Sequence, residues 1–217
     1  MMISATGLHR RLSLVVALVV LTLSIPAPGA EAQTIAGSVA RLRGDAEASQ
    51  GDATRRLAIG ATIFVGDEIA TGSNTRLELR MIDGTVVTLG DDTQLTIDEF
   101  LYNAETEEGR GVFGIATGVF RAITGAITKL REPELTVNTP VATIGIRGTD
   151  FWGDQKADRL QLALLSGGPI TVENAAGRLE LVAQKELTVV TSQDAPPSET
   201  VILTDEQLQA AAATVAF

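Results

Sequence analysis

Apolar and polar residues alternate along most of this chain, and this period of two is the feature that most constrains its fold. In one segment Leu77, Leu79 and Met81 occupy one face, and the arginine and glutamate side chains between them occupy the other. The same alternation recurs at six further places: residues 95–98, 135–138, 160–164, 170–172, 179–181 and 187–189. A β-strand places successive side chains on opposite faces, so we predict a short strand at each place.

Turn-forming residues separate the predicted strands at intervals of roughly ten residues. They lie at residues 83–84, 90–92, 167–168 and 174–177. Short strands at this spacing are typical of an all-β domain, whether sandwich, barrel or solenoid. We therefore predict an all-β fold, and the pattern leaves these three architectures open.

Residues 111–125 contain two similar copies of one motif, GVFGIATG and GVFRAITG, which share Gly118. A helical stripe of apolar residues also fits this segment. Its glycines and β-branched residues disfavour a helix, however, so we predict two short strands.

The C-terminal tail, residues 193–217, has a different pattern. Thr204 and Gln207 have the spacing of a helix capping box, and residues 208–213 are rich in helix-forming residues. We predict a short helix in this tail.

The first 32 residues have the features of a secretory signal peptide. Arg10 and Arg11 form a positive segment, and about 14 apolar residues follow before the first proline. Ala30 and Ala32 then supply the small residues that a signal peptidase recognises. A membrane-spanning helix needs about 20 apolar residues, which favours a cleaved leader over a retained anchor. We expect cleavage before Gln33, export to the periplasm or beyond the cell, and no integral membrane span in the mature chain.

Composition limits the chemistry available to the mature chain. The 217 residues include no cysteine and one histidine, His9, which lies in the leader. Residues 33–217 therefore lack the groups of a Ser-His-Asp triad, a cysteine nucleophile, or a thiolate or imidazole metal site. The net charge of −10 repels phosphate backbones, which argues against nucleic-acid binding. No carboxylate pair suggests a glycosidase and no calcium loop is present, so we predict no enzyme, no catalytic residue, no metal site and no cofactor.

The most distinctive segment is residues 139–151, TPVATIGIRGTDF. It resembles the hallmark of the FecR domain family, a Thr-Pro-x-Ala element followed by Val/Ile-Arg-Gly-Thr-x-Phe. Three further elements occur in the family's order: GDEIATG at 66–72, a strand–Asp-Gly–strand unit at 77–89, and GVFRAITG at 118–125. The resemblance extends over residues 37–190.

This resemblance implies an extracytoplasmic β domain of solenoid-like form that senses or contacts proteins. On this basis we assign residues 33–192 to a single FecR-type β domain of stacked short strands. In the founding members of the family, a cytoplasmic segment that regulates a sigma factor precedes one membrane helix. Here a leader precedes the domain, so we expect a free periplasmic module.

Seven motif residues are expected to shape turns and strand ends. Glycine and Asp-Gly pairs favour tight turns, and proline restricts its own backbone and that of the residue before it. This structural set comprises Gly66, Asp67, Asp83, Gly84, Thr139, Pro140 and Gly145.

The candidate binding residues are Arg147, Gly148, Thr149, Asp150 and Trp152. Arg147 has two interpretations: a structural arginine forked onto Asp67 or Asp150, or an exposed anchor for an anionic ligand. Trp152 is either a plug of the core or sheet edge, or a platform for a ligand. An exposed strand edge at 145–151 would accept a strand from a partner.

Three functions are compatible with these patterns. The first is a non-enzymatic, exported sensing or interaction module of the bacterial cell envelope, whose partner is an unidentified envelope protein. The second is a carbohydrate- or cell-wall-binding module in which Trp152 and Tyr102 line a groove. The third is a structural envelope component whose strand edges pair into oligomers. The family resemblance favours the first.

Overall fold

The alternating segments form strands in the structure, a computed structural model that describes residues 33–217. It contains 17 β-strands, one short 3-10 helix, η1 (Ala126–Lys129), and one α-helix, α1 (Asp205–Ala213). Each segment predicted from alternation coincides with a strand, which confirms the all-β class. The predicted leader, residues 1–32, lies outside the described residues.

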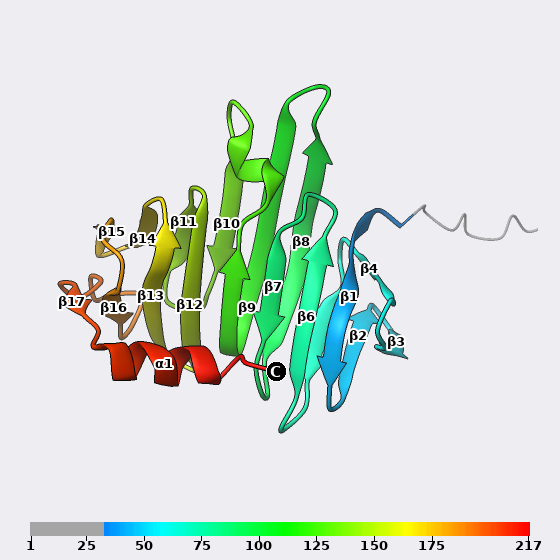
Figure 1. Cartoon of the computed structure of the whole chain (residues 1–217), viewed down its shortest axis with the longest axis horizontal. Helices are drawn as coiled ribbons and strands as arrows, with labels where there is room; N and C mark the ends of the chain where they lie inside the picture. Colours follow the sequence, from blue (N-terminus) through cyan, green and yellow to red (C-terminus); the bar gives the residue numbers. More distant parts are fainter. Residues whose placement is uncertain (1–32) are drawn as a thin grey trace, which may run out of the picture. The chain divides into compact units, whose positions relative to one another are not determined.

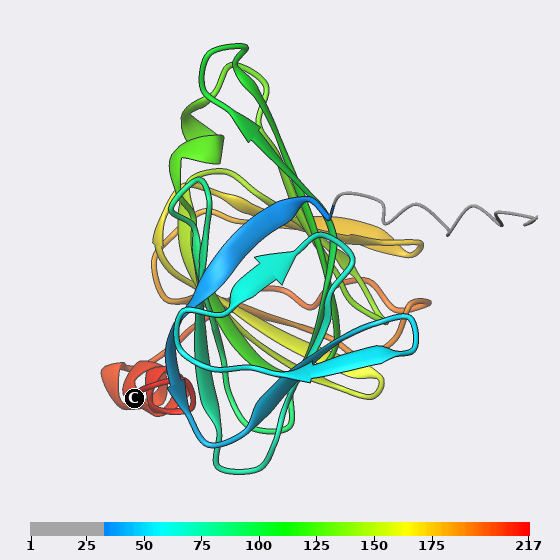
Figure 2. The same ribbon diagram turned by 90° about the vertical axis from the view of Figure 1, so that its right-hand side faces the viewer.

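The strands form one hydrogen-bonded network that folds into two layers, which we call sheet A and sheet B (Figures 1 and 2). Sheet A has the order β4 (Thr62–Phe64), β1 (Ile35–Arg43), β6 (Arg76–Met81), β7 (Val86–Leu89), β9 (Glu108–Ile123), β12 (Thr149–Lys156), β13 (Arg159–Gly167), β16 (Glu186–Val190) and β17 (Val201–Ile202). Sheet B has the order β3 (Ala53–Arg56), β2 (Ala46–Gln50), β5 (Glu68–Thr71), β8 (Gln94–Asn103), β9, β10 (Glu134–Asn138), β11 (Thr143–Ile146), β14 (Ile170–Asn174) and β15 (Gly177–Leu181).

Within residues 33–217 neither layer closes into a barrel, and the ladders are antiparallel except for the one between β9 and β10. A β-solenoid stacks successive coils in parallel ladders. The solenoid-like form expected from the sequence is therefore not confirmed. The chain instead passes back and forth between two mainly antiparallel layers.

The duplicated segment is one bent strand, β9, and the prediction of two short strands is wrong in this respect. The first half of β9 pairs with β8 in sheet B as far as Thr117, and the second half pairs with β12 in sheet A from Gly118 onward. Gly118 has a φ of +102°, and a Cβ atom at this position would lie 2.4 Å from the Cα of Thr93. Only glycine permits this conformation and this close approach, so the shared glycine marks a change of layer within one strand.

The apolar faces of the two sheets meet in a single main core. Its largest fully buried side chains come from both layers and include Phe120, Phe151, Ile63, Leu77, Leu95 and Ile144. The alternate, mainly polar residues of the same strands face outward. The core therefore leaves each sheet with one outer face on which a functional site can lie.

The hallmark segment has no exposed strand edge, which corrects that expectation. β11 lies between β10 and β14, and β12 lies between β9 and β13. The hydrogen-bonding sides of both strands are therefore already occupied. The outermost strands of the two layers are β3 and β15 in sheet B and β4 and β17 in sheet A.

The predicted C-terminal helix is present and begins with the predicted capping box. The hydroxyl of Thr204 accepts a hydrogen bond from the backbone N–H of Gln207, and the Gln207 side chain accepts one from the N–H of Thr204. The ammonium of Lys185 contacts the carboxylate of Asp205 at 2.6 Å and lowers the pKa of that carboxyl. In the part of the chain described, no helix is long and apolar enough to cross a membrane.

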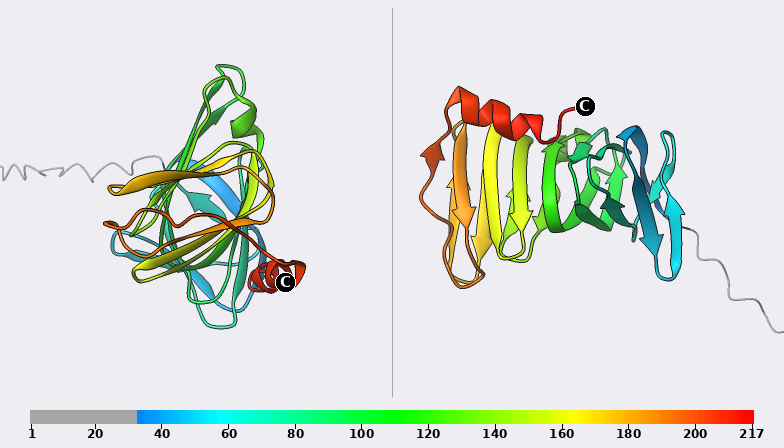
Figure 3. Two further views of the ribbon diagram at one scale, coloured as in Figure 1. Left: turned by 90° about the vertical axis from the view of Figure 1, so that its left-hand side faces the viewer. Right: turned by 90° about the horizontal axis from the view of Figure 1, so that it is seen from below.

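Helix α1 and the residues after it lie across the outer face of sheet A (Figures 1 and 3). The indole N–H of Trp152 donates to the hydroxyl of Thr214 at 2.9 Å, and Val215 packs with Trp152 and Leu187 in a second apolar cluster. At the end of the chain, the guanidinium of Arg41 lies 3.9 Å from the ring centroid of Phe217. The tail therefore covers an apolar patch that alternation alone leaves facing water.

Deleting residues 205–217 should expose the only tryptophan of the chain to water. Trp152 is 6% exposed, and its cover includes Thr214 and Val215. We expect a red-shifted fluorescence emission and stronger quenching by acrylamide. Phe217→Ala, which removes the ring beside Arg41 and keeps Thr214 and Val215, should keep the wild-type spectrum. An unchanged spectrum in the deletion variant would show that the tail does not shield Trp152.

Candidate functional site

The first part of the hallmark forms the turn between β10 and β11. The backbone N–H of Thr139 donates to the carbonyl of Ala142 at 2.9 Å, and the Thr139 hydroxyl accepts from the N–H of Ala142 at 3.1 Å. Pro140 lies inside this turn, where the sheet requires no hydrogen bond from its backbone nitrogen. Thr139 and Pro140 thus close the hairpin in which Asn138 faces Thr143.

The Gly66-Asp67 turn joins β4 to β5 through a buried carboxylate. The Asp67 carboxylate accepts hydrogen bonds from both terminal nitrogens of Arg55 and from the backbone N–H of Phe64 at 2.8 Å. Gly66 has a φ of +86°, which a residue with a side chain rarely adopts.

The Asp83-Gly84 turn joins β6 to β7 and also holds η1 in place. The buried Asp83 carboxylate accepts from the backbone N–H and the hydroxyl of Thr85, each at 2.8 Å, and from the N–H of Ile127 at 3.1 Å. Gly84 has a φ of +85°. This turn therefore positions the segment that leads into β10.

Arg147 is exposed, and the interpretation that pairs it with Asp67 or Asp150 is wrong. Asp67 binds Arg55, and Asp150 accepts two hydrogen bonds from Arg121, at 2.8 and 2.7 Å. These hydrogen bonds raise the pKa of the Arg121 guanidinium. Within residues 33–217 Arg147 takes part in no ion pair, so its charge is available to a ligand.

The other predicted binding residues lie in three different environments. Gly148 is exposed with a φ of +72°, whereas Thr149 is buried and its hydroxyl donates to the carbonyl of Gly168. Asp150 and Trp152 lie in sheet A, and the Trp152 ring is covered by the C-terminal tail. The structure therefore does not bring the five residues into one site, and it leaves no open face of Trp152 for a ligand.

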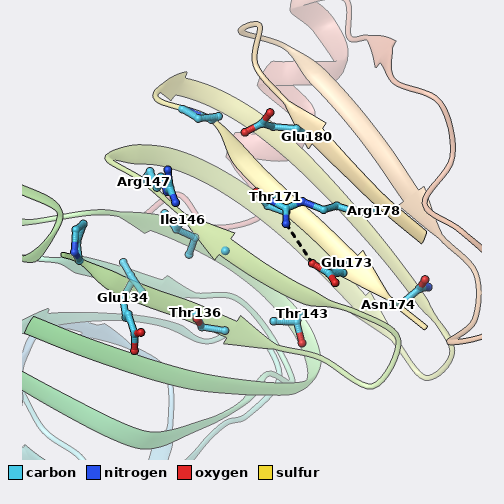
Figure 4. Close-up of a pocket in the computed structure, with 14 residues that line it drawn as sticks. Glu134, Thr136, Thr143, Ile146, Arg147, Thr171, Glu173, Asn174, Arg178 and Glu180 are labelled. Carbon is cyan, nitrogen blue, oxygen red and sulfur yellow. Dashed lines mark hydrogen bonds and ion pairs between the residues drawn. The ribbon is translucent and has the colours of Figure 1, made fainter. Parts of the chain in front are cut away.

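A groove of about 710 Å³ lies on the outer face of sheet B (Figure 4). It crosses β10, β11, β14 and β15, and its floor is a row of facing residues. The register places Thr136 opposite Gly145, Gly145 opposite Thr171, and Thr171 opposite Glu180. Three of these four positions carry small side chains or none, so the surface along this row is recessed relative to the residues beside it.

Longer side chains border this row on both sides. On one side Glu173 faces Arg178 across β14 and β15, and their charged groups approach to 3.6 Å. On the other side lie Arg147 and Glu134, and the Glu134 carboxylate contacts Arg110 at 3.3 Å. The groove thus has a narrow floor of small residues and charged walls of both signs.

Gly145 lies at the centre of the floor, and the fold does not require glycine there. Its φ is not in the left-handed region, and a Cβ atom would meet only the Cβ of Thr171, at an ordinary 3.7 Å. A glycine inside a strand costs about 0.5–1 kcal/mol relative to alanine. The absence of a side chain at this position therefore deepens the groove without a structural need.

Most groove residues were not among the predicted site residues. Alternation places Thr136, Thr171, Glu173 and Glu180 on the polar faces of their strands, which is the only signal that the sequence offers. Their convergence depends on β11 pairing with β14, a contact between strands separated by β12 and β13 in the chain. Of the predicted residues, the groove contains Gly145 and Arg147.

The fold is that of a two-layered, mainly antiparallel β domain with a polar groove on one outer face. Residues 67–168 match the family described as FecR protein, and this region contains β5 to β13 and the whole hallmark. This match confirms, over residues 67–168, the resemblance to the FecR family that the sequence motifs predict. A search of curated proteins finds no match.

Two solved structures share this fold. Both are crystal structures of a putative anti-sigma factor from Parabacteroides distasonis ATCC 8503, with a TM-score of 0.52 and 17% sequence identity. Each covers 66% of this chain, and this chain spans 63% and 62% of the two. At this identity the likeness is one of fold.

Replacing Asp83 with alanine should destabilise the domain by about 3 kcal/mol, because three donors lose a buried, charged acceptor. Urea unfolding followed by circular dichroism measures the loss. Asp158→Ala, at an exposed turn position, is the control and should stay within about 0.5 kcal/mol of wild type. Equal stability of both variants would contradict a structural role for Asp83.

Proposed function

We propose that this protein is an exported, non-enzymatic regulatory module of the bacterial cell envelope that works by binding a protein partner. The observation that carries the proposal is the place of the hallmark in the FecR domain. Its strand, β11, forms the centre of an exposed groove, and Arg147 stands beside that groove with an unpaired charge. The fold shared with a putative anti-sigma factor supports a regulatory role.

The lining of the groove favours a protein partner over a glycan. Glycan sites commonly use aromatic side chains as stacking platforms, and the 14 residues that line this groove include none. Trp152 is covered by the tail, and Tyr102 lies on β8, outside the groove. Hydroxyl, amide, carboxylate and guanidinium groups remain, which suit the mixed polar surface of a protein.

Short outer strands make edge-to-edge assembly the weaker alternative. β17 has two residues and β4 has three, so each offers few backbone groups to a second copy. The longer outer strands carry charged side chains, which oppose pairing: Arg55 and Arg56 on β3, and Arg178 and Glu180 on β15.

In-cell photo-crosslinking tests the proposed function. A photoreactive residue at Thr143, which is exposed in the groove, should form a reproducible adduct with one envelope protein that mass spectrometry identifies. The same residue at Asp158, in the turn between β12 and β13, is the matched control and should not form this adduct. A scan of exposed positions that yields no protein adduct would overturn the proposal.

Export is tested by the N-terminus of the purified protein. The proposal requires removal of residues 1–32, so intact-mass measurement should show a chain that begins at Gln33. Ala30→Leu replaces a small recognition residue and should leave the leader attached. A wild-type protein that keeps its leader would contradict a cleaved, free module.

A further inference from the structure

We propose that the groove of sheet B binds an extended polypeptide segment that runs across the strands and places an acidic side chain against Arg147. This inference rests on the proposed function and specifies the surface and the partner chemistry. It follows from the direction of the groove, from Gly145 and from the distribution of unpaired charge.

The floor of the groove has the dimensions of a short extended peptide. It runs along the row from Thr136 through Gly145 and Thr171 to Glu180, across four neighbouring strands. At about 4.8 Å between strands, the row is about 15 Å long. An extended chain advances about 3.3 Å per residue, so four or five residues fill it.

The bound segment would cross the strands instead of adding a strand to the sheet. β10, β11 and β14 are each paired on both sides, so their backbone groups are used within sheet B. Recognition therefore falls to side chains. The hydroxyl of Thr136 can donate to or accept from the backbone of a passing segment. The hydroxyl of Thr171 accepts a hydrogen bond from Arg178 at 3.4 Å and keeps its own proton to donate.

The charges indicate the side chains that the segment carries. Glu173 pairs with Arg178, and Glu134 shares Arg110 with Glu99. Within the described chain, Arg147 and Glu180 form no ion pair. Arg147 is the first residue after β11, and Glu180 lies on β15. A guanidinium binds a carboxylate through two parallel hydrogen bonds, so Arg147 selects an Asp or Glu of the partner.

Gly145→Val is the decisive variant, because it separates binding from folding. The new Cβ atom has an ordinary neighbour in the Cβ of Thr171, and valine has a β-branched shape that suits a strand, so we expect the melting temperature not to fall. The added methyl groups stand on the groove floor and block the segment.

The probe is a linear peptide selected from a random phage-displayed library on the purified protein. Selected peptides should contain Asp or Glu, and fluorescence anisotropy should show at least tenfold weaker binding to Gly145→Val. Arg147→Ala should also weaken binding about tenfold. Changing the peptide's acidic residue to its amide should weaken binding to the wild-type protein and have no further effect on binding to Arg147→Ala. Thr54→Val, an exposed position on β3 in the same layer, is the control and should bind as wild type.

Two results would overturn the inference: no peptide is enriched, or the enriched peptides bind Gly145→Val as tightly as wild type. Thr136→Arg blocks the same row from β10 and provides the same comparison if Gly145→Val folds poorly. The proposed function is retained in either case if photo-crosslinks to an envelope protein arise from other faces of the domain. Loss of all crosslinks rejects both.

Discussion

The architecture of this domain depends on the continuity of β9 through Gly118. This strand supplies hydrogen bonds to sheet B in its first half and to sheet A in its second, so it links layers that otherwise meet only through side chains and connecting segments. The left-handed φ of Gly118 excludes a side chain at the bend, and so does Thr93, whose Cα would lie 2.4 Å from an added Cβ atom. Sheet B gains β10 through its ladder with the first half of β9, and β10 in turn pairs with the hallmark strand.

The outer faces of the two sheets have different environments, and this difference locates the candidate site. Sheet A carries an apolar patch around Trp152, which α1 and the residues after it cover. Among residues 33–217 no segment covers sheet B in this way over β10, β11, β14 and β15, and the polar residues there line a groove open to water. Buried Asp83 stabilises the turn and η1 that precede β10, so a structural carboxylate supports the position of the groove without lining it.

The hallmark combines structural and functional roles along one short segment. Thr139 and Pro140 form a turn, Thr149 is a buried link to Gly168, and Asp150 holds Arg121. Between them, Gly145 and Arg147 face solvent in the groove. A sequence motif of this kind is therefore not a binding site as a whole, and only its outward-facing positions are candidates for contact with a partner.

Local sequence determined the strands, the polarity of their two faces and the capping box of α1, because each depends on residues that are near neighbours in the chain. Tertiary structure alone decided that GVFGIATG and GVFRAITG form one bent strand, that Asp67 and Asp150 bind Arg55 and Arg121, and that Arg147 is left exposed. It also decided which polar faces adjoin in the groove. Strand order and ion-pair choice arise from contacts between distant segments, and alternation carries no information about which strand lies beside which.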